Sequence, residues 1–300
     1  NRDKVAICGY HGWHDWYLAT NLNDNKALEE HLLPGLEPNG VPKALAGTVK
    51  PFSFNNLEQL KDIVSKNKLA AIKMEVERTS PPKEGFLGAI RELCDREKII
   101  LIFDECTSGF RETYGGIHKK YKINPDIAIF GKALGNGYAI TSIIGKKEIM
   151  EAAQNTFISS TFWSERIGPT AALKTLEVMK EERSWEQITN KGEVLRKIWL
   201  DIANKYKIKI NITGIRALSG FYFDNNNREY KTLISQEMLK KGFLASTTCY
   251  LSIAHNERIF DIYAKALSEV FKLISRCEDG YDINKILENP ICHNSFKRLN

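Results

Sequence analysis

Apolar and polar positions alternate in two distinct ways over the first 130 residues. Stretches with apolar residues at helical spacing are each followed by a short, unbroken apolar run rich in β-branched side chains. Three such pairs occur, at residues 57–67 and 69–75, 85–98 and 99–103, and 119–125 and 126–130. Short continuous apolar strands between helices indicate a parallel sheet that is covered on both faces. This part of the chain therefore predicts an α/β fold.

The pattern changes after residue 165. Apolar residues recur at helical spacing from 166 to 207, with an interruption at 183–185, which predicts two or three helices. The remainder predicts two strands and then two amphipathic helices, at residues 208–215, 218–224, 230–242 and 257–277. We therefore expect two domains: a large one at residues 1–180 with a mainly parallel sheet, and a smaller α+β domain at residues 181–300.

Composition narrows the classes of function. With 43% hydrophobic and 27% charged residues among 300, the chain has the profile of a soluble globular protein. The net charge of +6 comes from scattered Lys and Arg residues, which disfavours nucleic-acid binding. The six cysteines lack paired spacing, which is typical of reduced thiols in the cytoplasm. No apolar run reaches the roughly 18 residues of a membrane span, so we expect no membrane partner.

Ionisable residues stand at the ends of three predicted strands. Glu75, Asp104 and Lys132 each close an apolar run, and ligands of open parallel sheets bind beyond the carboxyl ends of the strands. We therefore expect these groups to converge on one crevice. Desolvation of Lys132 would favour its neutral amine, which is a nucleophile. The alternative is that Asp104 and Lys132 form a structural ion pair.

Five longer segments are more specific than single charges. They are GYHGWHDWY (9–17), GFLGAIRELCDREKIILIFDECTSGFRETYGG (85–116), NPDIAIFGKALGNGYAI (124–140), SSTFWSERIGPTAALKTLEVM (159–179) and CHNSFKRLN (292–300). In these motifs the chain resembles the class III aminotransferases, closest to the glutamate-1-semialdehyde aminomutase-like branch. The resemblance implies the pyridoxal-phosphate-dependent transferase fold of type I and pyridoxal 5′-phosphate as cofactor. It also implies transfer of an amino group from a small-molecule donor to a carbonyl acceptor.

The resemblance assigns roles to individual residues. Lys132 matches the lysine that attaches covalently to the cofactor's aldehyde carbon, and Asp104 matches the aspartate that keeps the cofactor's ring nitrogen protonated. Tyr10 matches the position that stacks on the ring, and Cys106 matches the opposite face, where relatives usually carry valine. For Tyr10, the alternative is an ordinary aromatic residue at a strand end.

Further roles concern hydroxyl, imidazole and charged groups. Thr161 matches a residue that contacts the phosphate of the neighbouring subunit's cofactor, so the resemblance implies a homodimer with shared active sites; a helix N-cap is the alternative. His11 and His14 lie three residues apart, but no companion His or Cys cluster completes a metal site. We interpret both as hydrogen-bonding groups near the cofactor. Glu105 and Arg111 are expected to be structural.

The chain departs from the family in ways that affect substrate and completeness. Relatives carry a Ser-Gly-rich phosphate-binding loop upstream, and this chain enters a predicted strand at residues 4–8 without an initial Met, so we expect a longer natural polypeptide. Val76 and Ser80 stand where relatives carry Pro and Asn. Thr247 and Thr248 replace a glutamate of the aminomutases, and their hydroxyls favour a polyhydroxy aldehyde or ketone, such as an amino-sugar precursor. The alternatives are an aminomutase and a non-catalytic fragment or partner subunit.

Overall fold

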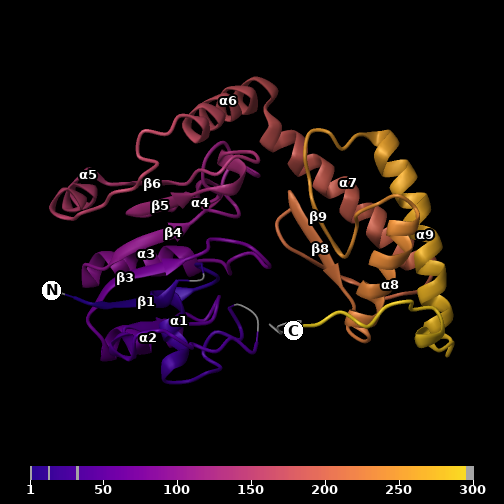
Figure 1. Cartoon of the computed structure of the whole chain (residues 1–300), viewed down its shortest axis with the longest axis horizontal. Coiled ribbons are helices and arrows are strands. Elements are labelled where there is room, and N and C mark those ends of the chain that lie inside the picture. Colours follow the sequence, from indigo (N-terminus) through magenta and orange to yellow (C-terminus); the bar gives the residue numbers. More distant parts are fainter. Residues whose placement is uncertain (1, 13, 32–33, 295–300) are drawn as a thin grey trace. The chain divides into compact units, whose positions relative to one another are not determined.

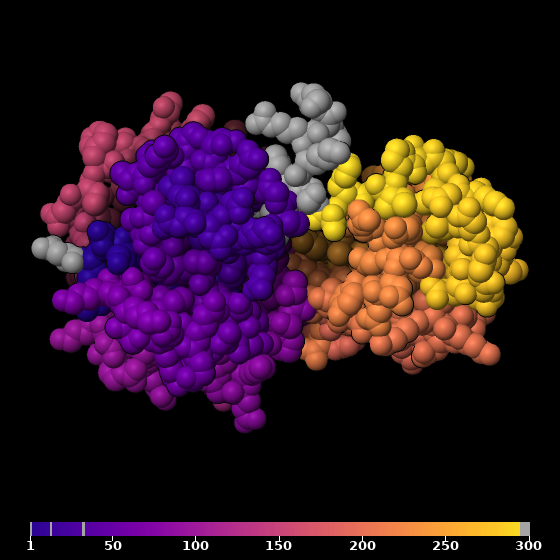
Figure 2. All heavy atoms as spheres, turned by 90° about the horizontal axis from the view of Figure 1, so that it is seen from below, coloured from indigo at the N-terminus to yellow at the C-terminus, as the bar shows by residue number. Residues whose placement is uncertain are grey.

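The computed structural model describes residues 2–12, 14–31 and 34–294 (Figure 1). The chain divides into two compact units, Asn1–Lys180 and Glu181–Asn294. Each unit is a closely packed body of atoms, the first mainly indigo to magenta and the second mainly orange to yellow in Figure 2. Residues 295–300, which end both the predicted second domain and the motif at 292–300, lie outside the described residues.

The first unit is built on one sheet with the strand order β2-β1-β3-β4-β5-β6. Neighbouring strands from β2 to β5 pair in parallel, whereas β6 pairs antiparallel with β5 at the edge. In the described chain the strands are β1 (Lys4–Cys8), β2 (Val49–Pro51), β3 (Leu69–Met74), β4 (Ile100–Asp104), β5 (Ile127–Phe130) and β6 (Ser142–Gly145). The predicted α/β fold with a mainly parallel sheet is confirmed.

Local sequence signals explain where the long helices of this unit begin and end. The Asn56 side chain accepts a hydrogen bond from the Gln59 N–H and so caps the start of α2. Lys98 ends α3 in the left-handed conformation, with a φ of 53°. From the start of the chain to residue 182 the described helices are α1 (Asp15–Leu18), α2 (Leu57–Lys66), α3 (Phe86–Glu97), α4 (His118–Tyr121), α5 (Lys147–Met150) and α6 (Ile167–Glu182). Short 3-10 turns lie at Ala19–Leu22, Lys43–Leu45, Lys132–Leu134 and Glu151–Asn155.

Several features of this unit differ from the sequence prediction, among them the short strand β2, which was not predicted. The predicted helix at 119–125 is wrong, because only one turn forms and Lys122 leaves it with a φ of 55°, three residues before Pro125. The edge strand β6 was not predicted. Its Ile143 and Ile144 are both more than half exposed, so the run lacks the buried and exposed alternation that marks a strand.

The second unit packs helices against a small antiparallel sheet with the order β7-β8-β9. Its strands are β7 (Asn211–Thr213), β8 (Leu218–Tyr222) and β9 (Thr248–Tyr250), and its helices are α7 (Ser184–Lys205), α8 (Asn227–Lys240) and α9 (Glu257–Glu278), followed by a 3-10 turn at Ile283–Lys285. The predicted interruption at 183–185 corresponds to Arg183, which separates α6 from α7 with a φ of 48°.

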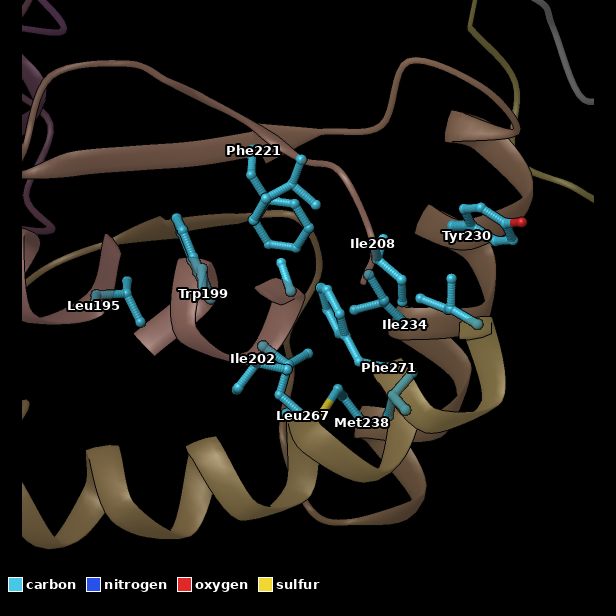
Figure 3. Packing of buried hydrophobic residues seen from close by; sticks show 14 of the residues in the cluster. Leu195, Trp199, Ile202, Ile208, Phe221, Tyr230, Ile234, Met238, Leu267 and Phe271 are labelled. Atoms are coloured by element: carbon cyan, nitrogen blue, oxygen red, sulfur yellow. The ribbon is translucent and has the colours of Figure 1, made fainter. Parts of the chain in front are cut away.

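Aromatic and aliphatic side chains together fill the core of the second unit (Figure 3). Trp199 of α7 and Phe221 of β8 are buried, with ring centroids 4.8 Å apart, and Phe271 of α9 packs against Phe221. The Trp199 indole N–H donates to the Tyr263 hydroxyl at 2.9 Å, so the one polar atom of the ring has a partner. The helical spacing of the sequence therefore places one apolar face of each long helix in this core.

Candidate functional site

The carboxyl ends of four neighbouring parallel strands lie along one edge of the sheet. Gly9 and Tyr10 follow β1, Glu75 follows β3, Asp104 ends β4, and Lys132 stands two residues after β5. Because these strands are adjacent and parallel, the segments that follow them emerge on the same side of the sheet. Polar groups that are far apart in the sequence therefore form one row along this edge of the sheet.

Asp104 is the most strongly held charge in this row. It is 7% exposed, its Oδ2 accepts a hydrogen bond from His11 Nδ1 at 2.9 Å and lies 3.4 Å from Lys73 Nζ, and its Oδ1 accepts from the Cys106 N–H at 3.2 Å. Burial alone raises the pKa of the Asp104 carboxyl, but His11, Lys73 and the Cys106 N–H together lower that pKa to about 2. The side chain is therefore an anion at neutral pH.

His11 combines one satisfied ring nitrogen with one that has no partner. Nδ1 faces Asp104, whereas Nε2 is buried and has no hydrogen-bond partner among the described residues. Because a buried polar atom without a partner costs free energy, this atom indicates a place for a polar ligand group. His14 is exposed and next to His11: its Nε2 lies 3.1 Å from the His11 carbonyl oxygen, and its Nδ1 accepts the Tyr17 N–H at the start of α1.

Lys132 begins a 3-10 turn in the left-handed conformation, with a φ of 46°, which is uncommon for a residue with a side chain. Its Nζ donates to the Thr107 hydroxyl at 2.7 Å. The expectation of a desolvated lysine is wrong for this chain: Lys132 is exposed, because the turn carries it out of the sheet. It borders a hollow of about 580 Å³, which Arg111 and Asn136 also line.

The alternative of a structural ion pair between Asp104 and Lys132 does not describe the structure. Within the described ranges, Asp104 contacts His11, Lys73 and the Cys106 N–H, whereas Lys132 Nζ donates to the Thr107 hydroxyl. Burial and Asp104 raise the pKa of the Cys106 thiol to about 11, while the charges of Lys132 and Lys73 act in the opposite direction. Cys106 is thus within electrostatic reach of Asp104 and of both lysines.

Tyr10 stands at the β1 end of the row. Its ring packs edge-on against Tyr17, with centroids 6.1 Å apart, and its N–H donates to Glu75 Oε2 at 3.2 Å. Burial raises the pKa of the Tyr10 hydroxyl. Beside it lies a second hollow of about 570 Å³, lined by Tyr10, His31, Phe54, Glu75, Arg78 and their neighbours.

Thr161 occupies an exposed turn, six residues before α6 begins at Ile167. The N-cap alternative is therefore wrong, since a cap directly precedes the first helical residue. Large apolar side chains surround it in sequence: Phe157, Phe162 and Trp163 are 98%, 76% and 73% exposed. A run of exposed aromatic residues on this scale is typical of a surface that contacts another protein.

Two further charged side chains at this edge of the sheet are Glu105 and Lys73. Glu105 is fully buried, and its carboxylate accepts hydrogen bonds from the Ser108 hydroxyl and the Ile117 and His118 N–H groups. It therefore holds the loop that follows Asp104, in keeping with the structural role we expected. Lys73 was missed altogether. Its only sequence signal is a charged residue inside the apolar run LAAIKM.

Comparison with known proteins identifies the family. The sequence profile of the class-III aminotransferases matches residues 5–271. The chain belongs to the class-III aminotransferase family. It is 31% identical to the 3-aminobutyryl-CoA aminotransferase of Cloacimonas acidaminovorans over 83% of this chain and 60% of that protein. It is 32% identical to the glutamate-1-semialdehyde 2,1-aminomutase of Methanosphaera stadtmanae over 77% of this chain and 56% of that protein.

Solved structures show the same fold. The FumI protein of Sphingopyxis sp. MTA144 superposes with a TM-score of 0.81 and 21% identity over 95% of this chain and 68% of that chain. An omega-transaminase from Sphaerobacter thermophilus gives a TM-score of 0.78 and 18% identity over 92% of this chain and 69% of that chain. The predicted fold, type I of the pyridoxal-phosphate-dependent transferases, is confirmed. The chain spans 56–60% of the two curated relatives named above.

Proposed function

We propose that this chain is the main part of a pyridoxal-phosphate-dependent aminotransferase that transfers an amino group to an aldehyde or ketone. The observation that carries the proposal is the Asp104 carboxylate, held as a buried anion between His11 and Lys73 on the same sheet edge as Lys132. A buried anion and a lysine amine on one sheet edge fit a cationic ring that attaches through a carbonyl group.

The residues present fit the cofactor in four respects. Asp104 presents a second oxygen, Oδ1, which accepts a hydrogen bond from the Cys106 N–H. The buried His11 Nε2 lacks a partner there, and a polar substituent of the cofactor would supply one. Tyr10 and Cys106 offer a ring and a small side chain for the two faces of the cofactor. Lys132 provides the amine for covalent attachment.

The protein's own groups then divide the chemistry between them. The cofactor, when bound, supplies an electron sink for the carbon that carries the amino group. Asp104 holds the proton on the ring nitrogen, because its depressed pKa keeps it negative. Lys132 acts as the base that takes the proton from the substrate carbon and returns it. The Thr107 hydroxyl, 2.7 Å from Lys132 Nζ, orients that amine.

The acceptor we propose is a polyhydroxy aldehyde or ketone of the amino-sugar precursor class. The support is Thr247 and Thr248, which offer hydroxyls where aminomutases carry a glutamate; in the second unit Thr247 is buried and Thr248 opens β9 and is exposed. A hydroxyl can both donate to and accept from the hydroxyls of such a substrate.

An aminomutase is the second candidate, because the 32% identical Methanosphaera relative has that activity in its name. The two functions differ in stoichiometry. A transaminase releases a keto product from its amino donor when no acceptor is present, in an amount equal to the enzyme sites. An aminomutase isomerises one compound and needs no separate donor. We expect single-turnover mixing of the full natural polypeptide with a panel of amino acids to yield one keto product per site; turnover of glutamate-1-semialdehyde alone, without that product, contradicts the proposal.

We further propose a homodimer with shared active sites. The support is the exposed aromatic run around Thr161, whose Phe157, Phe162 and Trp163 side chains would be buried by a second copy. In such a dimer the Thr161 hydroxyl would contact the cofactor phosphate of the partner. The third possibility, a non-catalytic fragment or partner subunit, predicts that the full natural polypeptide releases no keto product at all in the same mixing experiment.

For localisation we propose the cytoplasm, because all six cysteines are free thiols. None of the helices in the described ranges is long and apolar enough to cross a lipid bilayer. Across those same residues, no three His, Cys, Asp or Glu side chains gather as metal ligands do. The proposed partners are accordingly small molecules and a second copy of the chain.

A further inference from the structure

Lys73 is the penultimate residue of β3, an otherwise apolar strand inside the sheet. In the sheet register it lies opposite Ile7 of β1 and Ile102 of β4. Its side chain is only 14% exposed. Lysine is rarely buried to this degree without a partner, and an isoleucine would fill the same position without the cost of desolvating a charge.

The partner of Lys73 is one particular oxygen of Asp104. Side chains alternate along a strand, so Ile102 and Asp104 point to the same face, and Lys73, opposite Ile102, lies on that face too. Its Nζ is 3.4 Å from Oδ2, the oxygen that also accepts from His11. Oδ1 accepts from the Cys106 N–H at 3.2 Å. Lys73 and His11 thus both contact Oδ2, whereas Oδ1 contacts the backbone of Cys106.

A purely structural role explains this arrangement poorly. Burying an ion pair costs about as much desolvation free energy as the attraction returns, so well-packed apolar residues are often equally stable. Asp104 already has a closer partner in His11, at 2.9 Å. The positive charge of Lys73 on the same oxygen therefore adds little to the free energy of folding. It does reduce the attraction of the Asp104 carboxylate for a further cationic group.

We propose that Lys73 is a positioning residue of the cofactor site: with His11 it fixes Oδ2 of Asp104, so that Oδ1 faces the ring nitrogen of the cofactor, and its charge weakens protonation of that nitrogen. The inference rests on the proposed function, since it concerns the same Asp104. A positive charge near the nitrogen disfavours a second one there, so Lys73 reduces the pull that Asp104 exerts on the ring proton.

The titratable groups that face Asp104 come from three strand ends. They are Tyr10 and His11 after β1, Lys73 on β3, and Cys106 after β4. Cys106 serves as a probe that needs no cofactor, because the charge of Lys73 lowers its thiol pKa. Removing that charge raises the pKa and reduces the thiolate fraction.

The first experiment measures alkylation of Cys106 by iodoacetamide at pH 9 in the cofactor-free full natural polypeptide, read by peptide mass spectrometry. The variants are Lys73→Met, which removes the charge, Lys73→Arg, which keeps it, and Lys68→Met, which removes an exposed lysine just before β3. We expect Lys73→Met to slow alkylation about threefold, as a half-unit rise in pKa requires. Lys73→Arg and Lys68→Met should match the wild type. Cys249 of the second unit, whose pKa is raised by burial alone, is the internal reference.

The second experiment follows the ring nitrogen itself by NMR, with ¹⁵N-labelled pyridoxal 5′-phosphate bound to the same proteins. We expect the nitrogen to remain protonated to a pH about one unit higher in Lys73→Met than in the wild type, with Lys73→Arg unchanged. A shift at Cys106 without a shift at the nitrogen overturns the inference, because Lys73 then acts only in a structural ion pair. No shift at either probe, in protein that carries the cofactor on Lys132, also overturns it and leaves the proposed function standing. Failure of every variant and of the wild type to bind the cofactor overturns the proposed function, and the inference with it.

Discussion

Replacing Asp104 by Asn removes a negative charge with almost no change in shape. The change removes the negative charge that attracts His11 at 2.9 Å and Lys73 at 3.4 Å, in a side chain that is 7% exposed. Folding lowers the pKa of this carboxyl from 3.8 to about 2. A difference of that size corresponds to about 2 kcal/mol of stability. We therefore expect Asp104→Asn to lower the free energy of unfolding at pH 7 by about 2 kcal/mol.

The same reasoning fixes how the loss depends on pH. A group whose pKa is depressed in the folded state stabilises the protein above its unfolded pKa. The contribution of Asp104 is therefore complete at pH 7 and is lost as the pH falls from about 4 towards about 2. Urea unfolding curves at pH 7 and at pH 3 should show the wild type and the Asn variant converging as the pH falls. A difference that stays constant or grows towards acid contradicts the assignment.

We expect Asp104→Asn to reduce kcat by more than its loss of stability alone would. An amide cannot hold a proton on the ring nitrogen, and electrostatic stabilisation of this kind is typically worth about 3 kcal/mol or more, which is at least about 100-fold in kcat. The assay is the rate of keto-product release with an amino donor, at a temperature where both proteins are folded and carry the cofactor. Asp62→Asn is the control, because Asp62 forms an exposed pair with Lys66. Near-normal turnover by Asp104→Asn with bound cofactor would refute the reasoning.

Three further changes test other parts of the account. Lys132→Ala should change the free energy of unfolding by less than about 0.5 kcal/mol, because the side chain is exposed, and should abolish keto-product release. Urea unfolding curves and activity assays measure the two effects, and a large loss of stability contradicts the exposed position of Lys132. Trp199→Ala should cost about 3–5 kcal/mol in the second unit, because it empties a fully buried site, and a cost below about 1 kcal/mol contradicts the packing. Mixing inactive Lys132→Ala protein with inactive Thr161→Glu protein should restore activity in at most about a quarter of the active sites, because each hybrid dimer holds one site with both native residues. If proven hybrid dimers show no activity, Thr161 does not act across an interface.

The sheet could be predicted from the sequence because its central strands are unbroken apolar runs. In β4 and β5 the side chains of Leu101, Phe103, Ala128 and Phe130 are buried, so each of these apolar runs corresponds to a strand of the sheet. Edge elements carry a weaker signal. β6 exposes both of its isoleucines, and α4 stops after one turn at Lys122, three residues before Pro125.

The site was only partly accessible from the sequence. Strand ends identify Asp104 and Lys132, and the family motif adds Tyr10 and His11. The contact between Lys73 and Asp104 was out of reach, because it depends on the register of β3 against β4, which brings residue 73 opposite residue 102. The exposure of Lys132 was also unpredictable, since it follows from a left-handed turn at the lysine itself.

The lysine to which the cofactor attaches shows most directly whether Lys132 binds pyridoxal 5′-phosphate. The full natural polypeptide is incubated with pyridoxal 5′-phosphate, reduced with borohydride, digested and mapped by mass spectrometry. Borohydride fixes the cofactor to the lysine that binds it, so we expect one pyridoxyl adduct, on Lys132, and none in Lys132→Ala protein. An adduct on Lys73, Lys146 or Lys147 instead, or no adduct in folded protein, contradicts the account.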